Sequence, residues 1–376
     1  MAPKSLARKV GRPQNEGVRA AWRIVCGACG PRTVSTVKHC AALALAAALP
    51  AQPPPDLRAD VNLVRVPCAV REANGAPAQG LRGDQFVVLD DGVPQPVEYV
   101  WQELDLPLTV GLISECSCLI AALMDSQRKP LMQFIARVIS PQDRVFLVSV
   151  AKQQRLAVDL TNSVDSLRAA VEGLGQREGA VLGKACSGAH PTRRSSASPP
   201  CGGQTLWNGV FFAARLKMRP QSGRKALLLF TDGRDTGSDH GLTDAIEACQ
   251  AAGTAVYSIR YGPIRHGHRA ATVLADIVSP PAIFLVKDPY AEFTRAARDL
   301  ERISRETGGL EFDAEYYTRP DKLTAIFDRI ESDLRSQYVL AYRLPATHAP
   351  GTYHRIAVKV ARPGVTVRAR VGYYAP

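Results

Sequence analysis

The sequence predicts an α/β fold in which a doubly wound, mostly parallel central sheet carries helices on both faces, with a small β-sandwich beside it. Two observations predict this fold. Between residues 106 and 334, short apolar segments alternate with segments of helical periodicity, as in parallel sheets covered by helices. On both sides of that region, the chain has short β-branched segments separated by turns that contain Gly or Pro.

The alternating region predicts one domain over residues 104–336. Its expected strands are 108–114, 144–150, 226–231, 255–261 and 310–312. Its expected helices are 119–139, 163–174, 206–218, 242–252, 293–307 and 320–334. Segments 175–200 and 263–289 lack periodicity, so we expect them to be loop insertions.

The two chain ends predict one shared β-sandwich. In residues 58–103 we expect strand 61–66, a turn at Asn74-Gly75 and a hairpin around Asp90-Asp91-Gly92, whose strands are 86–89 and 93–100. In residues 337–376 we expect strands 337–342, 355–361 and 365–371. Because a few short strands need a partner face, we expect the two units to pack together.

Residues 1–51 have the layout of a secretory leader. They hold eight Lys/Arg and one acidic residue, and the basic part leads into the apolar run 41–49. Small residues and the Pro-rich linker 52–57 follow. This order is typical of a signal peptide cleaved after Ala51, so we expect export to the periplasm, the cell surface or the medium. The alternative is a buried Ala/Leu helix, which the flanking charge and prolines disfavour.

The rest of the chain is mildly basic, with 39 basic and 34 acidic side chains. Nucleic-acid binding usually needs a clustered basic face, so we expect no nucleic-acid partner. The apolar run of the leader is too short to span a bilayer, and no other stretch is suited to it, so we expect no transmembrane segment in the mature chain.

Polar residues follow two of the expected strands. Strand 108–114 leads into Ser114 to Cys118, and strand 226–231 leads into Thr231 to Gly233. Ligands of open α/β sheets gather outside the carboxyl ends of the strands. We therefore expect these two loops to lie near one another.

Several strings resemble the von Willebrand factor type A (VWA) family, and more narrowly its bacterial VWFA-related branch. Each is weak alone, but their order is specific: VNLVRV at 61–66, LPLTVGLI at 106–113, GRKAL at 223–227, TDGRDTGS at 231–238, LRSQY at 334–338 and GYY at 372–374. The resemblance implies a metal-ion-dependent adhesion site. In that site Asp-x-Ser-x-Ser, a Thr from a second loop and an Asp from a third hold a divalent cation.

The chain departs from this ligand pattern. Two positions match it, namely Ser117 at the first Ser and Asp232 at the last Asp. The other three positions differ. Glu115 replaces the first Asp, Leu119 replaces the second Ser, and Gln204 replaces the Thr. A threonine, Thr205, follows one residue after that position. Two interpretations stay open for this degenerate site. Either Mg²⁺ or another divalent cation binds weakly, or none binds while Asp232 braces its loop and Ser117 bonds to the backbone.

We expect a non-catalytic binding or scaffolding protein, with a role such as cell adhesion. Its recognition face comprises loops 115–119, 202–208 and 232–238, and its partner is a protein. The residues expected to contact that partner are Cys116, Cys118, Leu119, Asn208, Arg234 and Asp235. The alternative is a structural subunit that docks into a cell-envelope assembly through the terminal β-sandwich, with a vestigial VWA face. No enzyme is expected, because no motif assembles a nucleophile, a base and an oxyanion donor.

Two short motifs are given no function. Arg82-Gly83-Asp84 spells an integrin-binding tripeptide, but a turn before the strand 86–89 favours Gly and Asp in any case. His266-Gly267-His268 has no acidic or thiol partner nearby in the sequence, and we expect it to be solvated.

Six cysteines follow the leader, and four of them lie near the expected recognition loops. We expect a disulfide that joins Cys186 or Cys201 to Cys116 or Cys118 and fastens the face that a cation normally organises. For Cys68 and Cys249 the rival expectation is a buried thiol. Intact-mass measurement of the mature protein with and without reductant should reveal the disulfide, and six reactive thiols would contradict it.

Overall fold

The computed structural model describes residues 63–102, 106–116, 124–174, 204–261, 289–314 and 320–375. The chain divides into the units Met1–Arg58 and Ala59–Pro376, and all described residues belong to the second unit. The expected leader and linker, the insertion 175–200 and all but the last residue of the insertion 263–289 lie outside the described residues.

The central sheet has six strands in the order β10-β9-β8-β5-β6-β7. Its strands are β5 Leu108–Glu115, β6 Arg144–Val150, β7 Gln154–Thr161, β8 Arg224–Thr231, β9 Ala255–Arg260 and β10 Glu311–Asp313. All neighbouring pairs are parallel except β6 and β7. The expected mostly parallel sheet is confirmed.

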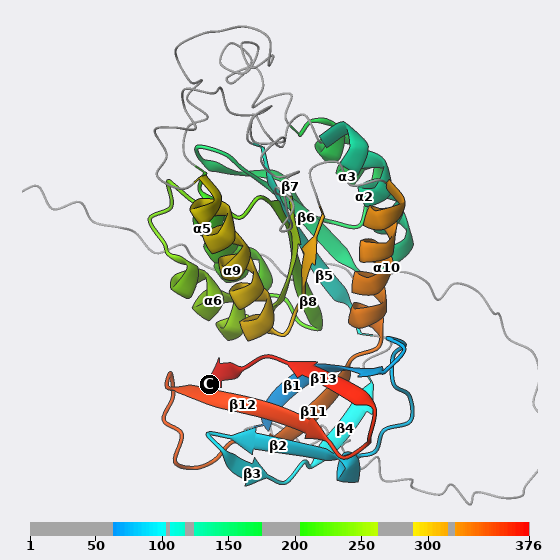
Figure 1. The fold of residues 1–376 in the computed structure, drawn as a ribbon, viewed down its shortest axis with the longest axis vertical. Coiled ribbons are helices and arrows are strands. Elements are labelled where there is room, and N and C mark those ends of the chain that lie inside the picture. The colour runs from blue at the N-terminus through cyan, green and yellow to red at the C-terminus, as the bar shows by residue number, and fades with distance from the viewer. Residues whose placement is uncertain are drawn as a thin grey trace, which may run out of the picture. The chain divides into compact units, whose positions relative to one another are not determined.

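Helices cover both faces of this sheet (Figure 1). On one face lie α2 Met124–Val138, α3 Val164–Glu172 and α10 Pro320–Arg335. On the other lie α5 Leu206–Phe212 with its continuation η2 Ala213–Met218, α6 Leu242–Ala251 and α9 Pro289–Thr307. Each face has its own buried apolar cluster, so the doubly wound arrangement is confirmed. No helix of the described ranges is both long and apolar enough to cross a membrane.

Strand β7 was not predicted from the sequence. It lies at the edge of the sheet, and its side chains are partly or fully exposed along its whole length. The register shifts between β6 and β7 interrupt the alternation of apolar and polar residues. Without a buried face, the segment therefore lacks the periodicity that reveals a strand.

The two chain ends form two four-stranded antiparallel sheets, β13-β1-β11-β4 and β14-β12-β2-β3. The first contains β1 Leu63–Glu72, β4 Tyr99–Gln102, β11 Tyr338–Arg343 and β13 Val365–Ala369. The second contains β2 Phe86–Asp90, β3 Val93–Gln95, β12 Tyr353–Val360 and β14 Gly372–Tyr374. Side chains from both sheets share one apolar core, so the expected sandwich is confirmed.

The Asp90-Asp91-Gly92 hairpin is confirmed, but its second strand is shorter than expected. Asp91 and Gly92 have φ values of 49° and 83°, as a tight primed turn requires. The single strand expected over 93–100 is wrong, because β3 ends at Gln95 and β4 belongs to the other sheet. Pro96 has no N–H to donate to a ladder, which favours an end to the pairing at this point.

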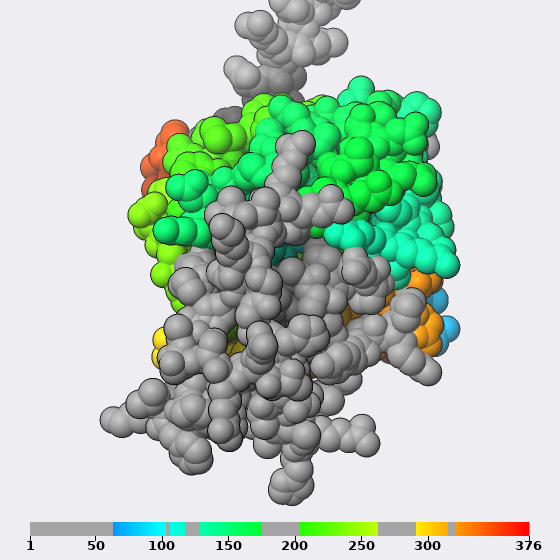
Figure 2. All heavy atoms as spheres, turned by 90° about the horizontal axis from the view of Figure 1, so that it is seen from above, coloured from blue at the N-terminus to red at the C-terminus, as the bar shows by residue number. Residues whose placement is uncertain are grey.

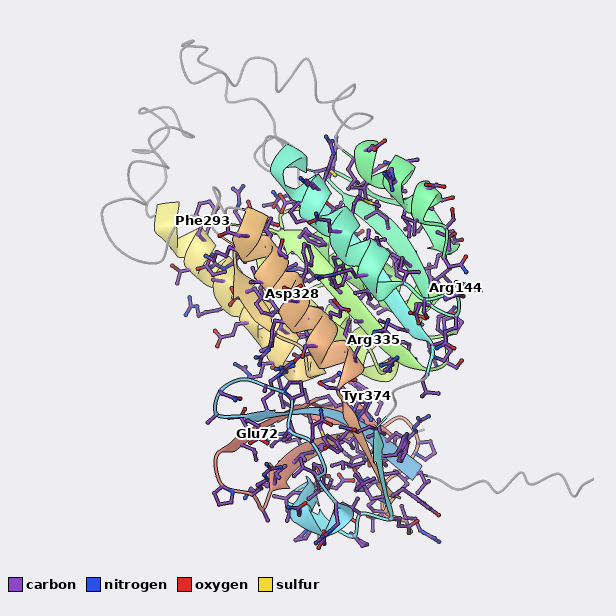
Figure 3. The ribbon with its side chains drawn as sticks, turned by 90° about the vertical axis from the view of Figure 1, so that its right-hand side faces the viewer. Glu72, Arg144, Phe293, Asp328, Arg335 and Tyr374 are labelled. Carbon is purple, nitrogen blue, oxygen red and sulfur yellow. The ribbon has the colours of Figure 1, made fainter. Side chains whose placement is uncertain are left out.

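A buried carboxylate joins the sandwich to the α/β domain. Asp333 of α10 is fully buried and accepts hydrogen bonds from Arg71 of β1 and Arg368 of β13. Arg71 is also buried and donates to the Gly75 carbonyl at 2.8 Å. Figure 3 shows α10 running toward the sandwich, with Arg335 near that end. Because two arginines of the sandwich bond to this one carboxylate of α10, the junction depends on Asp333.

Asp333→Asn removes the negative charge that pairs with Arg71 and Arg368 of the sandwich and with Arg329 of α10. We expect it to lower the free energy of unfolding by about 3–5 kcal/mol, measured by urea unfolding. The control is Asp328→Asn on the same helix, where the Asp328 pair with Arg137 is half exposed. That change should cost no more than about 1 kcal/mol. Equal effects of the two substitutions would contradict the role given to Asp333.

Candidate functional site

The carboxyl ends of β5 and β8 bring the candidate residues together. These strands are parallel neighbours, with Ser114 opposite Phe230, so Glu115 and Thr231 leave the sheet side by side. Gln204, just before α5, reaches the same edge and donates from Nε2 to Glu115 Oε1 at 2.5 Å. We call this edge the rim. Figure 2 shows the molecule from above the view of Figure 1. The surface coloured green and teal there belongs to residues between 124 and 261.

Glu115 is the hub of the rim. Its side chain is fully buried, and both carboxylate oxygens accept hydrogen bonds. Oε1 accepts from Gln204, while Oε2 accepts from the Thr231 hydroxyl at 2.7 Å and the Asp232 N–H at 3.0 Å. The Thr231 hydroxyl in turn accepts from the Gly233 N–H at 2.9 Å, which directs its own proton toward Glu115. Three donors therefore take over the hydration that the carboxylate loses on burial.

Asp232 is neutralised by an arginine two residues later. It is 1% exposed, and its Oδ1 accepts from the Arg234 N–H at 2.9 Å. Its Oδ2 accepts from Arg234 Nε at 2.9 Å and lies 2.9 Å from Nη2. The guanidinium also lies over the Phe293 ring, 5.1 Å from its centre, near the first turn of α9 (Figure 3). Burial raises the pKa of Asp232, while Arg234 opposes that rise.

The loop after β8 caps the start of α5. The Trp207 N–H donates to Asp235 Oδ1 at 3.2 Å, and the Asn208 N–H donates to the Ser238 hydroxyl at 3.0 Å. The Ser238 hydroxyl donates to Asp235 Oδ1 at 2.6 Å, which holds the two capping groups together. A carboxylate at a helix N-terminus also interacts favourably with the helix dipole. The two loops therefore form one connected unit.

Residues 122–298 match the family model described as the von Willebrand factor type A domain. The chain contains a von Willebrand factor type A domain. No curated protein matches the chain in sequence.

Several solved structures resemble the chain at low identity. A von Willebrand factor type A protein from Catenulispora acidiphila is 11% identical, with a TM-score of 0.41, over 83% of this chain and 73% of that one. BatB from Bacteroides thetaiotaomicron is 15% identical, with a TM-score of 0.37, over 59% and 97%. Proximal thread matrix protein 1 from the mussel byssus, with a zinc-occupied MIDAS motif, is 14% identical, with a TM-score of 0.40, over 65% and 49%.

The expected site residues of the VWA domain fall into three groups. Glu115, Gln204 and Asp232 meet at the rim, as expected from the strand topology. Thr205 and Cys116 lie beside them but bond to backbone carbonyls, those of Ala151 and Ser114 respectively. The third group lies outside the described residues and consists of Ser117, Cys118, Leu119, Cys186 and Cys201.

Two residues expected to contact a partner form hydrogen bonds within the loops. Asn208 is 4% exposed, and its Oδ1 accepts from the backbone N–H groups of Asp239 and His240. Asp235 caps α5. The sequence interpretation also missed Thr231, although its position directly before Asp232 at a strand end was a usable signal. It missed the Asp232–Arg234 pair as well, for which the Asp-Gly-Arg spacing was the signal.

The described rim residues do not fit a resident Mg²⁺ ion. Such an ion needs about six oxygen ligands at 2.0–2.1 Å. Here both oxygens of Glu115 accept from protein donors, and Gln204 directs its amide nitrogen at Glu115. Among these side chains, only the buried Gln204 Oε1 has no hydrogen-bond partner, and one such oxygen is far from a shell of six. Asp232 already has a cationic partner in Arg234. The guanidinium therefore supplies the positive charge that a cation would bring to this carboxylate.

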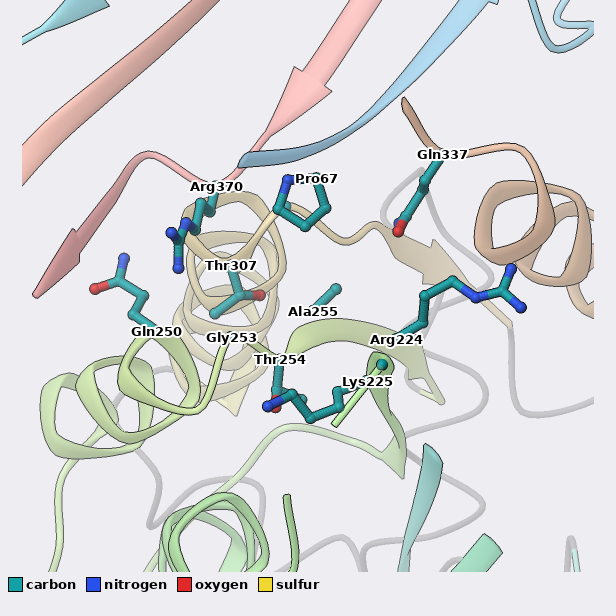
Figure 4. Close-up of a pocket in the computed structure, with 12 residues that line it drawn as sticks. Pro67, Arg224, Lys225, Gln250, Gly253, Thr254, Ala255, Thr307, Gln337 and Arg370 are labelled. Atoms are coloured by element: carbon teal, nitrogen blue, oxygen red, sulfur yellow. The ribbon is translucent and has the colours of Figure 1, made fainter. Parts of the chain in front are cut away.

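A separate pocket lies at the opposite ends of β8 and β9, against the sandwich (Figure 4). It is basic, because Arg224, Lys225 and Arg370 line it and no acidic side chain does. Burial lowers the pKa of Lys225, and the nearby Arg370 and Arg65 lower it further. None of the rim residues described above lines this pocket, so it is not part of the rim.

Cys68 and Cys249 are buried free thiols. Burial raises the pKa of Cys68 to about 12, so its reactive thiolate form is rare at neutral pH. These two cysteines are part of the apolar cores of the sandwich and of the VWA domain, respectively.

Arg234→Ala leaves the buried Asp232 without its ion-pair partner. We expect a loss of about 3 kcal/mol in the free energy of unfolding at pH 7. Without Arg234, the pKa of Asp232 in the folded protein rises further above its unfolded value, so protonation favours the folded state. The deficit should therefore shrink as the pH falls from 7 to about 4.5. Urea unfolding of both proteins at the two pH values measures this.

The matched control is Arg137→Ala, which breaks a half-exposed pair on α2 and should cost no more than about 1 kcal/mol at pH 7. A deficit of Arg234→Ala that stays the same at both pH values would show that Asp232 does not depend on Arg234 for its charge.

Proposed function

We propose that the chain is an exported bacterial protein that binds a protein partner through the rim of its VWA domain, without a divalent cation. The observation that carries this proposal is the Asp232–Arg234 ion pair. It gives the degenerate adhesion site a fixed positive group in place of a metal. The order of basic, apolar and small residues in the segment 1–51 supports export.

The chemistry of the rim favours an acidic partner group. The Arg234 side chain is 32% exposed, so its guanidinium contacts solvent as well as Asp232 and Phe293. The planar guanidinium group presents five N–H donors and suits a carboxylate. The backbone hydrogen bonds from Thr236 and Gly237 to the Gln204 carbonyl, at 3.1 and 3.0 Å, hold the loop around it in place. Preorganised loops of this kind lower the entropic cost of binding.

One observation favours docking through the sandwich as the second candidate function. Four of the six exposed large apolar side chains in the described residues lie on the sandwich: Val87, Val93, Tyr99 and Tyr353. Exposed apolar groups of this kind often mark contact surfaces when they are contiguous.

Site-specific photo-crosslinking separates the two candidates. A photoreactive residue at Asp239, exposed on the rim loop, should crosslink one partner in the native envelope or secreted fraction. The same residue at Val93, 59% exposed on β3, should not. The crosslink should persist in EDTA, and calorimetric titration with Mg²⁺ and Mn²⁺ should give no heat at millimolar cation.

Arg234→Ala should lower the yield of the rim crosslink at least tenfold, as expected for loss of about 1.4 kcal/mol or more. Arg137→Ala is the matched control and should leave the yield unchanged. A crosslink from Val93 alone would support docking through the sandwich. A crosslink abolished by EDTA would contradict binding without a cation.

A further inference from the structure

The basic pocket between the VWA domain and the sandwich has cations but no acid. Lys225 is the second residue of β8, and Arg370 lies in the sandwich between β13 and β14. Both line the pocket together with Arg224, and we call it the junction pocket. Arg224 donates to the Leu334 and Leu106 carbonyls at 2.9 and 2.6 Å. In Figure 4 its guanidinium points away from the other two cations.

Lys225 and Arg370 bond to neutral groups. Lys225 Nζ donates to the Gln221 carbonyl at 3.1 Å, and Arg370 Nη2 donates to the Arg65 carbonyl at 2.9 Å. A carbonyl accepts hydrogen bonds but brings no negative charge. By contrast, the buried Arg260 pairs with two carboxylates. No acidic side chain lines the junction pocket, so the described residues leave its positive charge uncompensated.

The positive charges of the junction pocket also repel one another. Burial lowers the pKa of Lys225, and the charges of Arg370 and Arg65 lower it further. Burial also lowers the pKa of Arg370. An anion between Lys225 and Arg370 offsets both effects, because an opposite charge nearby favours the charged form of a side chain.

A buried donor points independently to a ligand. Arg370 Nε is buried and has no hydrogen-bond partner in the part of the chain that the structure describes. Leaving a buried donor unpaired is costly, and a bound ion or water is a common explanation for such an atom. Figure 4 shows Arg370 and Lys225 extending from opposite sides of the pocket, one from the sandwich and one from β8.

The size of the junction pocket limits the ligand to a small ion. The cavity measures about 60 Å³. Since one water molecule needs roughly 10–15 Å³, this cavity has room for about four water-sized groups. Phosphate and sulfate each present four oxygens, and as dianions they offset the charges of both side chains.

We propose that the junction pocket binds one free phosphate or sulfate ion between Lys225 and Arg370. The ion links β8 of the VWA domain to the sandwich through charge-assisted hydrogen bonds. This site does not involve the rim, which lies at the other end of β8.

The test is equilibrium dialysis of the full chain against radiolabelled inorganic phosphate, in a chloride buffer of constant ionic strength. One equivalent of phosphate should bind, and sulfate should compete with it. Acetate should not compete at the same concentration, because it carries a single charge and two oxygens. Phosphoserine should compete at least tenfold more weakly than unlabelled phosphate, because its phosphate group carries a substituent too large for the cavity.

Two double variants locate the bound ion. Lys225→Gln with Arg370→Gln removes both cations and should weaken phosphate binding at least tenfold. The matched control is Lys359→Gln with Arg343→Gln, which removes the same two charges from exposed positions of the sandwich. This control should leave phosphate binding unchanged.

Arg234→Ala separates this site from the function proposed for the rim. It removes the partly exposed guanidinium of the rim and should leave phosphate binding unchanged. Phosphate binding that is absent, that survives the loss of Lys225 and Arg370, or that disappears with Arg234 would overturn the proposal. Acetate or phosphoserine that competes as well as phosphate would also overturn it.

Lys225→Gln alone decides the question if the double variant fails to fold. The side chain is half-buried, and the glutamine amide can still donate a hydrogen bond, so the fold should persist by circular dichroism. Phosphate affinity should nevertheless fall at least tenfold. Unchanged affinity in a folded Lys225→Gln protein would contradict the assignment.

Discussion

The buried carboxylate of Glu115 is the constraint on which the rim depends. A charge at the end of the central strand loses its water, and the protein must supply hydrogen bonds in exchange. The donors come from the ends of two other segments, Gln204 before α5 and Thr231 with Asp232 at the end of β8. The Glu115 side chain, at the end of β5, therefore holds the segment before α5 and the segment after β8 in place.

The departures of this sequence from the adhesion-site pattern form a consistent set. Glu115 is one methylene longer than Asp, and its carboxylate bonds to donors from both neighbouring loops. Gln204, in place of Thr, brings an amide donor to it. Arg234 then provides the charge that Asp232 requires. These three interactions are all made within the protein, as the proposed cation-independent rim requires.

Strands that are buried have a clear pattern of apolar residues and were predicted from the sequence. A strand without that pattern was missed. Strands β5, β6, β8 and β9 are almost wholly buried and read as apolar runs. Edge strand β7 has no buried face and was missed. At the rim, strand topology predicted which segments meet. The Asp232–Arg234 pair was missed although its spacing was a signal. The contact of the Arg234 guanidinium with Phe293 of α9, far along the chain, was beyond reach.

The buried acids of this protein are stabilised in two ways. Among the described residues, the buried carboxylates Asp143, Asp232 and Asp333 each have an arginine within 4.0 Å. Asp90 is as deeply buried, but two phenol hydroxyls and the ring of His348 surround it instead. Neutral phenols supply hydrogen bonds without supplying positive charge. Glu115 likewise accepts from an amide, a hydroxyl and a backbone N–H, so neutral donors also serve a fully buried acid in this chain.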